Sequence, residues 1–281
     1  MISPATRSKI SGLTLALIVT GMSCCSNQVE QSGNSHAASS REAANLRIGT
    51  YNLYVGAHDL PQTVAVLKRM DADVIALQEV RPDNAQNLYR AFAAHYPHRY
   101  FSSAMGLLSR YPLRHPNFQR SQRGINGFLF AEIDHPQGRL QVANIHLDPL
   151  RLWTGKDILM LPFQFGRNRS IQRDELLQVF GHLNPSLPTL LVGDFNRVSD
   201  DVIHKLQRVG FTDSFADVTK NADHISTLHF SFLGIHFGRR IDFIFHDRNF
   251  HTILSEVIHG KPSDHDALVS GLVWNRSITF R

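Results

Sequence analysis

Short apolar runs alternate with amphipathic stretches along the chain from Leu46 onward. The runs LRIGTYNL (46–53) and DVIALQE (73–79) have the length and apolar continuity of buried strands. Between them, Asp59 and Pro61 are typical of a helix start, and the amphipathic pattern extends this helix to Met70. The same reasoning predicts further helices at 82–94, 167–183 and 199–209, and further strands at 105–114, 127–134, 139–147, 189–194, 240–246 and 267–274.

The predicted order combines strands joined through helices with strands joined by tight turns. HPQG (135–138), between two strand-like runs, is a typical hairpin turn. We therefore expect an α/β fold that contains antiparallel hairpins. A sheet built only from parallel βαβ units fits this order poorly.

The first residues differ in character from the rest of the chain. Arg7 and Lys9 precede an apolar stretch at 10–22, which is shorter than the roughly 20 residues of a membrane span and is followed by small and polar residues. This order is typical of a secretory signal, with a short membrane anchor as the alternative. GMSC (21–24) resembles a bacterial lipobox, although Gly21 stands where Leu is usual; cleavage within SHAASS (35–40) is the alternative.

These features divide the chain into a signal peptide at 1–25, a flexible tether of small polar residues at 26–45 and a folded domain at 46–281. We expect a monomeric, exported protein: periplasmic, secreted, or a lipoprotein attached to a membrane through Cys24. Cys24 and Cys25 are the only cysteines, so the folded domain has no disulfide. Its stability must come from its core.

The distribution of charge is more informative than its sum. The formal net charge of +5 falls to +3 once the two basic residues and no acids of residues 1–23 are removed. The segment 84–131 contains no Asp or Glu but six arginines, namely Arg90, Arg99, Arg110, Arg114, Arg120 and Arg123. If these lie on one face they would attract a polyanion, and otherwise they are scattered, solvated side chains.

Polar side chains that can perform chemistry recur at the carboxyl ends of the predicted strands. Each one alone is explained by a turn or by an ordinary structural histidine. Eight such residues at six strand ends are better explained by a common cleft at one sheet edge. These residues are Asn52, Glu79, His146, Asp194, Asn196, Asp242, Asp264 and His265.

The residue types also indicate which metal such a cleft would take. Glu79, Asp194 and Asp264 offer the carboxylate oxygens that a hard cation such as Mg²⁺ requires, with Mn²⁺ as an alternative. Zinc would prefer more nitrogen or sulfur ligands, and the folded domain contains no thiol.

Seven motifs, taken in order, resemble the endonuclease/exonuclease/phosphatase superfamily, which has the DNase I-like fold. They span nearly all of 46–274 and are TYNL, LQEV, LLSRYPL, IHLD, GDFN, RIDFIF and SDHDAL. The resemblance implies a four-layered α/β sandwich, in which two packed mixed β-sheets are flanked by helices and the active site lies at one end. It also implies that 46–281 is a catalytic domain for metal-assisted hydrolysis of a phosphoester.

The resemblance further implies a role for each residue. Glu79 would bind the metal directly, with Asn52 and Asp264 close by as ligands or through water. Asp194 would orient or deprotonate the attacking water, and Asn196 would hold that water or a phosphate oxygen. His146, and His265 paired with Asp242, would donate hydrogen bonds to the phosphoryl oxygens.

The substrate class stays open between several phosphoesters. The arginine-bearing segment favours DNA or RNA, and hence a phosphodiesterase of nuclease type. The apolar segments 150–165 and 228–237 favour a phospholipid, as in a sphingomyelinase, unless they simply pack on the domain. A phosphomonoesterase is a further alternative, and so is a non-catalytic binding module, although no site residue has been lost.

Overall fold

The computed structural model describes residues 43–56, 59–150, 160–197, 199–232 and 235–275. The predicted signal peptide and all but the end of the predicted tether lie outside the described residues. Among the described residues, no helix is both long and apolar enough to cross a membrane.

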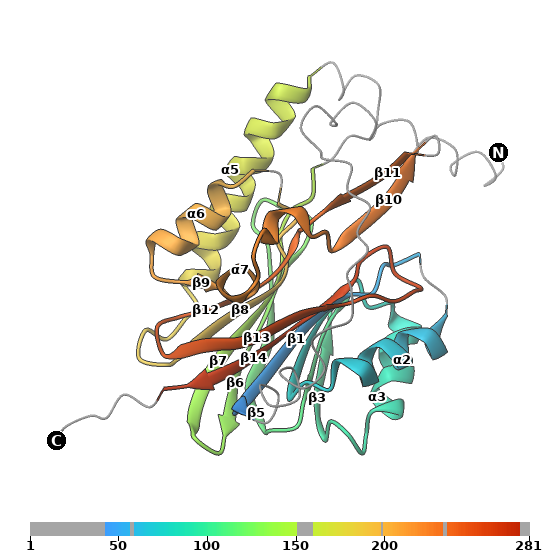
Figure 1. The fold of residues 1–281 in the computed structure, drawn as a ribbon, viewed down its shortest axis with the longest axis vertical. Helices are drawn as coiled ribbons and strands as arrows, with labels where there is room; N and C mark the ends of the chain where they lie inside the picture. Colours follow the sequence, from blue (N-terminus) through green and yellow to red (C-terminus); the bar gives the residue numbers. More distant parts are fainter. Residues whose placement is uncertain (1–42, 57–58, 151–159, 198, 233–234, 276–281) are drawn as a thin grey trace.

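Two six-stranded sheets pack face to face at the centre of the molecule (Figure 1). In spatial order, the first sheet contains β13 (Phe250–Ile258), β14 (Ala267–Trp274), β1 (Leu46–Asn52), β2 (Val74–Gln78), β4 (Met105–Ser109) and β3 (His98–Ser102). The second contains β5 (Leu113–Arg120), β6 (Gly127–His135), β7 (Gly138–His146), β8 (Thr189–Asp194), β12 (Asp242–His246) and β9 (Thr212–Asp213). A separate hairpin consists of β10 (Leu228–Phe232) and β11 (Ile235–Arg239).

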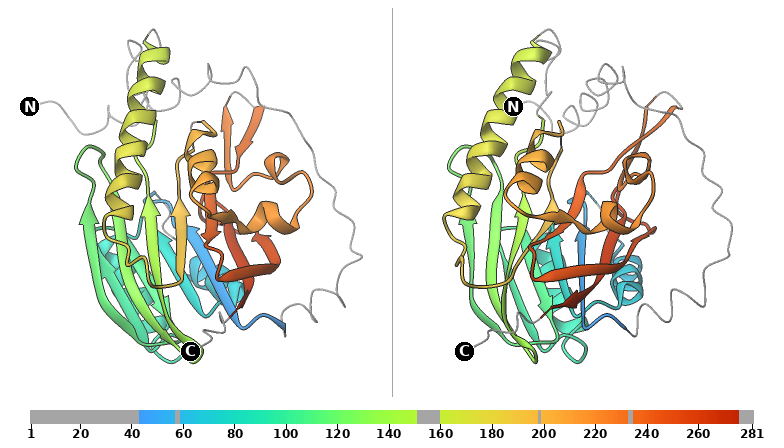
Figure 2. Two further views of the ribbon diagram at one scale, coloured as in Figure 1. Left: turned by 90° about the vertical axis from the view of Figure 1, so that its left-hand side faces the viewer. Right: turned by 60° about the vertical axis from the view of Figure 1, so that its left-hand side comes forward.

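Helices cover the outer faces of both sheets, which gives the four layers expected from the sequence (Figures 1 and 2). Leu67 of α2 (Leu60–Met70) and Leu88 of α3 (Pro82–Ala91) pack on the first sheet. Leu176 of α5 (Leu161–Phe180) and Leu206 of α6 (Asp201–Arg208) pack on the second. The short helices α7 (Ser214–Val218) and η3 (Ala222–His224) follow β9. Because both faces of the central strands are covered, every residue of β1, β2 and β8 is buried.

One parallel pair of strands in each sheet determines where the polar strand ends meet. β1 and β2 run parallel and are joined through α2, and β7 and β8 run parallel and are joined through α5. The carboxyl ends of a parallel pair lie at the same edge of its sheet. Packing the two sheets brings both edges together at one end of the sandwich.

The segment 105–114, predicted as one strand, is instead divided between the two sheets. β4 ends at Ser109, whose hydroxyl accepts a hydrogen bond from the Tyr111 N–H (3.0 Å) and donates one to the Tyr111 carbonyl (2.7 Å). Pro112 has no N–H for a strand ladder, so pairing stops and the chain crosses to the second sheet, where β5 begins at Leu113. The prediction of a single strand here was wrong.

Other element boundaries differ less. The predicted helix at 167–183 begins earlier, at Leu161, because Pro162 suits the first turn of a helix. The HPQG turn is confirmed, since His135 pairs with Gly138 across it. The predicted apolar segment 228–237 forms most of the β10–β11 hairpin, which extends beyond the sheets on the same side as the start of α5 (Figures 1 and 2). Of the other apolar segment, residues 151–159 lie outside the described part of the chain.

Candidate active site

Strand register aligns three of the predicted residues in one row across the second sheet. His146 pairs with Asp194 across β7 and β8, and Asp242 pairs with Asp194 across β12 and β8. Residues paired in register point to the same face of a sheet. The alternation along β8 shows which face this is, because Asp194 is in phase with Leu190 and Val192 of the core between the sheets.

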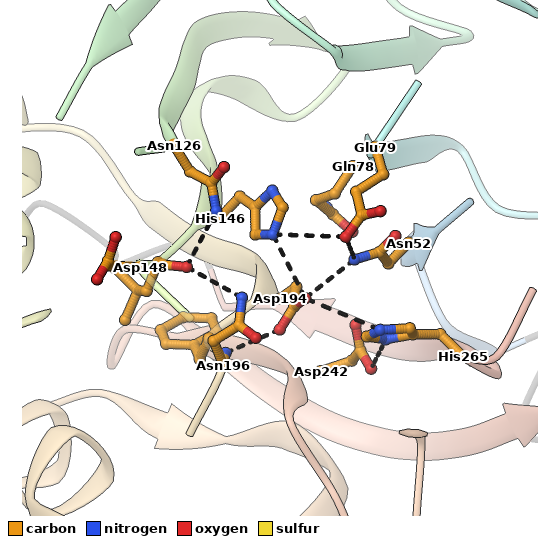
Figure 3. A network of polar contacts seen from close by, with 12 residues as sticks. Asn52, Gln78, Glu79, Asn126, His146, Asp148, Asp194, Asn196, Asp242 and His265 are labelled. Carbon is orange, nitrogen blue, oxygen red and sulfur yellow. Dashed lines mark hydrogen bonds and ion pairs between the residues drawn. The ribbon is translucent and has the colours of Figure 1, made fainter. Parts of the chain in front are cut away.

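The first sheet contributes Asn52 and Glu79 to the same space (Figure 3). Asn52 is in phase with the core residue Ile48, and its side-chain amide donates to Glu79 Oε1 (3.1 Å) and Asp194 Oδ2 (3.0 Å). Glu79 follows β2 with a left-handed φ of 54°, which turns its carboxylate toward the site, where Oε2 accepts the Val55 N–H at 2.9 Å. In this arrangement the Asn52 oxygen accepts the Tyr54 N–H instead of facing the carboxylates. Its role as a metal ligand stays a prediction.

A layer of buried polar side chains between the two sheets, which was not predicted from the sequence, lies next to this site. Gln78 donates to Thr50 Oγ1 (3.1 Å) and to Asn144 Oδ1 (2.7 Å), and all three side chains are buried. The Asn144 amide also donates to the carbonyls of Leu77 and Gly106, so it joins the two sheets. Thr50 and Asn144 precede Asn52 and His146 by two positions, and Gln78 pairs with Asn52 across β1 and β2. A polar residue two positions before a strand-end site residue was therefore the sequence signal that could have found this layer.

His265 and Asp242 form the buried pair expected from the sequence. His265 Nδ1 lies 2.9 Å from Asp242 Oδ2, and His265 Nε2 lies 4.0 Å from Asp194 Oδ2. Burial lowers the pKa of His265, but the charge and hydrogen bond of Asp242 outweigh it and raise this pKa to about 10. The ring is therefore an imidazolium at neutral pH.

Two hydroxyl groups hold this pair in place, and neither was predicted. Ser263 Oγ donates to the Asn52 carbonyl (2.7 Å) and accepts the His265 N–H (3.0 Å), which fastens the loop to the end of β1. Thr227 Oγ1 accepts the N–H groups of Ile241 and Asp242, both at 3.1 Å. The SDH motif contains the first of these residues, whereas no sequence signal pointed to Thr227.

The pKa values of Asp194 and His146 are shifted in opposite directions from their ordinary values. Burial, aided by the charge of Asp242, raises the pKa of Asp194 to about 7. Burial also lowers the pKa of His146 to about 4, against the opposing charge of Glu79. His146 Nε2 lies 3.6 Å from Asp194 Oδ2, so a neutral imidazole stands beside a carboxyl group that is able to exchange a proton near pH 7.

Asn196 braces this corner of the site. Its backbone N–H donates to Asp194 Oδ1 (2.7 Å), and its side-chain amide donates to the Leu147 carbonyl (3.0 Å). Asn126, which was not predicted, donates to the same carbonyl at 3.3 Å (Figure 3). Asp148 of the IHLD motif, also unassigned from sequence, is buried and accepts the Ile125 N–H at 3.0 Å.

The site opens into a cavity of about 630 Å³. Glu79, His146, Asp194, Asn196 and His265 line one part of it. Phe118, Arg120 and Asn126 also line it. The reacting groups therefore share one cavity with an aromatic and a cationic side chain.

The six arginines of 84–131 do not gather on this cavity. Arg110 pairs with Asp71 and Asp73, and Arg114 and Arg123 pair with other carboxylates. Arg99 lies over the ring of Tyr89. Arg120 is the member of the set that lines the cavity.

The donor set fits a divalent cation. Glu79, His146 and Asp194 each offer a ligand atom within 4.8 Å of the others. Among the described residues, the buried oxygens Asp242 Oδ1 and Asp264 Oδ1 lack a hydrogen-bond partner. Buried carboxylate oxygens without a partner are costly unless a cation or donor compensates them. Asp264 Oδ1 lies 4.0 Å from His265 Nε2.

Fold and site together define a hydrolytic centre at the end of a two-sheet α/β sandwich. Residues 49–265 match the profile of the Endonuclease/Exonuclease/phosphatase family. This match covers most of the chain, and the protein therefore belongs to that family. Its members are metal-dependent phosphoester hydrolases, so the protein is an enzyme of this type.

Several solved structures share the fold. The endonuclease/exonuclease/phosphatase from Beutenbergia cavernae is 20% identical, with a TM-score of 0.63 over 82% of this chain and 72% of that one. TDP2 of D. rerio, complexed with single-strand DNA product, is 16% identical, with a TM-score of 0.65 over 81% of this chain and 98% of that one. Sphingomyelinase C from Streptomyces griseocarneus is 13% identical, with a TM-score of 0.57 over 80% and 98%. No curated protein matches the sequence at a significant level.

Proposed function

We propose that the protein is an exported, Mg²⁺-dependent phosphodiesterase of nuclease type. The observation that carries the proposal is the shared cavity, which is lined by the reacting groups and also by Phe118 and Arg120. An aromatic ring and a guanidinium suit a base and a neighbouring phosphate of a nucleic acid strand. Export rests on the signal sequence predicted at the amino terminus.

Of the donor set, Glu79 would hold the metal together with Asp264, while His146 and Asp194 would act on the phosphate and the water. Asn52 positions Glu79 through its amide. When bound, a divalent cation neutralises charge on the phosphate and on the leaving oxygen. The buried, partnerless oxygen of Asp264 supports this assignment. Manganese would satisfy the same oxygen ligands.

Asp194 is the group best placed to take a proton from the attacking water. Its pKa of about 7, caused first by burial, lets it accept a proton near neutral pH. Asn196 and Asn52 keep its carboxylate oriented through hydrogen bonds of 2.7 and 3.0 Å. Attack by a single water in line with the leaving group would invert the configuration at phosphorus.

The two histidines take different parts. His265, held as an imidazolium by Asp242, donates a hydrogen bond to a phosphoryl oxygen as negative charge grows in the transition state. His146, neutral because burial lowers its pKa to about 4, donates as an uncharged imidazole. Two titratable groups of one type, pushed to opposite ionisation states, are typical of a catalytic centre.

A sphingomyelinase-like activity is the second candidate, favoured by a different observation. The β10–β11 hairpin and the start of α5 extend beyond the sheets on the same side, and Phe163 near that start is 63% exposed (Figure 1). An exposed aromatic residue at a projecting tip suits contact with a bilayer. The structural similarity to a sphingomyelinase supports this candidate, and the similarity to a DNA-bound TDP2 supports the first.

An activity panel with Mg²⁺ separates these candidates. Purified protein is tested on plasmid DNA, single-stranded DNA, RNA, sphingomyelin vesicles and a phosphomonoester, each beside the Asp194→Ala variant. Cleavage of nucleic acid that Asp194→Ala lacks supports the proposal. Release of choline phosphate or inorganic phosphate, with the nucleic acids left intact, overturns it in favour of the lipid enzyme or the phosphomonoesterase.

A further inference from the structure

A second cluster of side chains able to bind a metal lies beside the loop that carries Asp264 and His265. His229 belongs to β10, His259 follows β13, and Asp266 follows His265. Backbone bonds hold the hairpin on this loop, because the His229 N–H donates to the Asp264 carbonyl (2.8 Å) and the Asp266 N–H to the Thr227 carbonyl (2.6 Å). Three separate elements therefore meet at one point.

The two imidazoles converge on one carboxylate oxygen. His229 Nε2 and His259 Nδ1 each lie 2.7 Å from Asp266 Oδ2. The ligand atoms of the three side chains all lie within 4.8 Å of one another. Asp266 is buried, whereas the side chains of His229 and His259 are 50% and 74% exposed, so the cluster is open to ions from solution.

The chemistry of this cluster differs from that of the catalytic centre. Two nitrogens and one oxygen match a three-ligand zinc site, which leaves a fourth position for water. The surrounding groups also orient the ligands: the Gly260 N–H donates to Asp266 Oδ1 (3.3 Å), and the His229 ring donates to the Ser226 backbone carbonyl. The catalytic centre, in contrast, is dominated by oxygen.

We propose that His229, His259 and Asp266 bind a second divalent cation of the zinc class, outside the catalytic centre. A tetrahedral zinc ion with ligand distances of about 2.0–2.2 Å separates its ligand atoms by about 3.3–3.5 Å, so each imidazole nitrogen would move roughly 0.6–0.8 Å farther from Asp266 Oδ2. The exposed imidazoles have room for this. Such an ion would fasten the β10–β11 hairpin to the end of β13 and to the loop that carries His265.

Cobalt provides a direct test, because four-coordinate Co²⁺ in a zinc site absorbs visible light strongly. The full chain is stripped of metal and titrated with Co²⁺, and Zn²⁺ is then added to displace it. His259→Ala removes a ligand that is 74% exposed, and His251→Ala, which removes an exposed histidine at the opposite end of β13, is the control. Glu79→Gln monitors the catalytic centre, and circular dichroism verifies folding.

We expect a visible Co²⁺ band that Zn²⁺ displaces, unchanged in His251→Ala and Glu79→Gln. In His259→Ala the apparent Kd should weaken by about 100-fold or more, as for loss of a ligand. His229→Gln should give the same loss, which guards against a folding defect in one variant. A band of equal strength in His259→Ala, or one lost only in Glu79→Gln, would overturn the proposal.

Discussion

Replacing Asp242 with Asn should remove a pH dependence of stability that its carboxylate creates. Asp242 is fully buried, and its Oδ2 lies 2.9 Å from His265 Nδ1. Asn keeps the size of the side chain and can still accept the Nδ1 hydrogen bond, but it removes the negative charge. Burial of His265 then acts unopposed by that charge, so its pKa should fall to its ordinary value or below.

The magnitude follows from linkage between protonation and folding. The pKa of His265 is raised from the ordinary 6.5 to about 10. A base whose pKa is higher in the folded state than in the unfolded state stabilises the folded protein. For His265 this stabilisation is complete at pH values below 6.5, the pKa of the unfolded state, and is lost as the pH rises through 10. At about 1.4 kcal/mol per pKa unit, the metal-free protein should lose roughly 3–4 kcal/mol between pH 7 and pH 10 from this group.

Urea denaturation in EDTA, followed by circular dichroism at four pH values from 7 to 10, measures this loss. The wild type should lose stability across the range, whereas Asp242→Asn should lose little through His265. Asp83→Asn, which removes a carboxylate on the surface of α3, is the control and should behave as the wild type. Parallel loss in the wild type and in Asp242→Asn would refute the assignment of a charged His265.

Three further predictions concern the support of the site and its substrate. In Gly193→Ala the new Cβ would lie 2.0 Å from the Ile145 carbonyl oxygen, so the free energy of unfolding should fall by about 3 kcal/mol or more and activity should fall with it. Gly210→Ala, at φ +92° with open space around the new Cβ, should cost only about 1 kcal/mol in the same denaturation assay. Equal costs in the two variants would contradict this. Asn144→Leu leaves the buried carbonyls of Leu77 and Gly106 without their donor and should lower the free energy of unfolding by about 2–4 kcal/mol. An unchanged melting temperature would show that these hydrogen bonds between the sheets are dispensable. Arg120→Ala should raise the KM for single-stranded DNA several-fold and reduce the salt dependence of that KM. Arg114 pairs with Asp134 and does not line the cavity, so Arg114→Ala should change neither quantity. Equal KM values in the two variants would show that Arg120 does not bind the substrate.

The meeting of the candidate residues could be predicted from the sequence because strand alternation is a local property. Asn52, His146 and Asp194 are in phase with the apolar residues Ile48, Val142 and Val192, so one periodic pattern places core and site on the same face. The parallel order of strands then brings their ends together. The four-layered sandwich is confirmed on this basis.

What the sequence could not supply depends on contacts between distant segments. Nothing local separates His146 from His265, yet one is neutral and the other charged, because only His265 lies against Asp242 of another strand. The division of 105–114 between two sheets likewise depends on which strand each half finds as a partner. Thr227 and Asn144 support the site from positions that are remote in sequence from the residues they hold.

The same limit applies to the arginine-bearing segment. A stretch without acidic residues does not by itself make a basic face, because Arg110 and Arg114 find carboxylates from other segments. Charge counted along the chain ignores these partners. Only the folded arrangement shows that Arg120 reaches the cavity.

We propose that the strand-end cluster gives the protein metal-dependent phosphodiester hydrolase activity, whatever its natural substrate. The most direct measurement is hydrolysis of bis(p-nitrophenyl) phosphate by metal-stripped protein, before and after addition of Mg²⁺ or Mn²⁺, for the wild type and Asp194→Ala. We expect activity that requires the metal and falls by about 10²–10³-fold or more in Asp194→Ala, with folding preserved. Activity that persists in EDTA, or that Asp194→Ala retains, would contradict it.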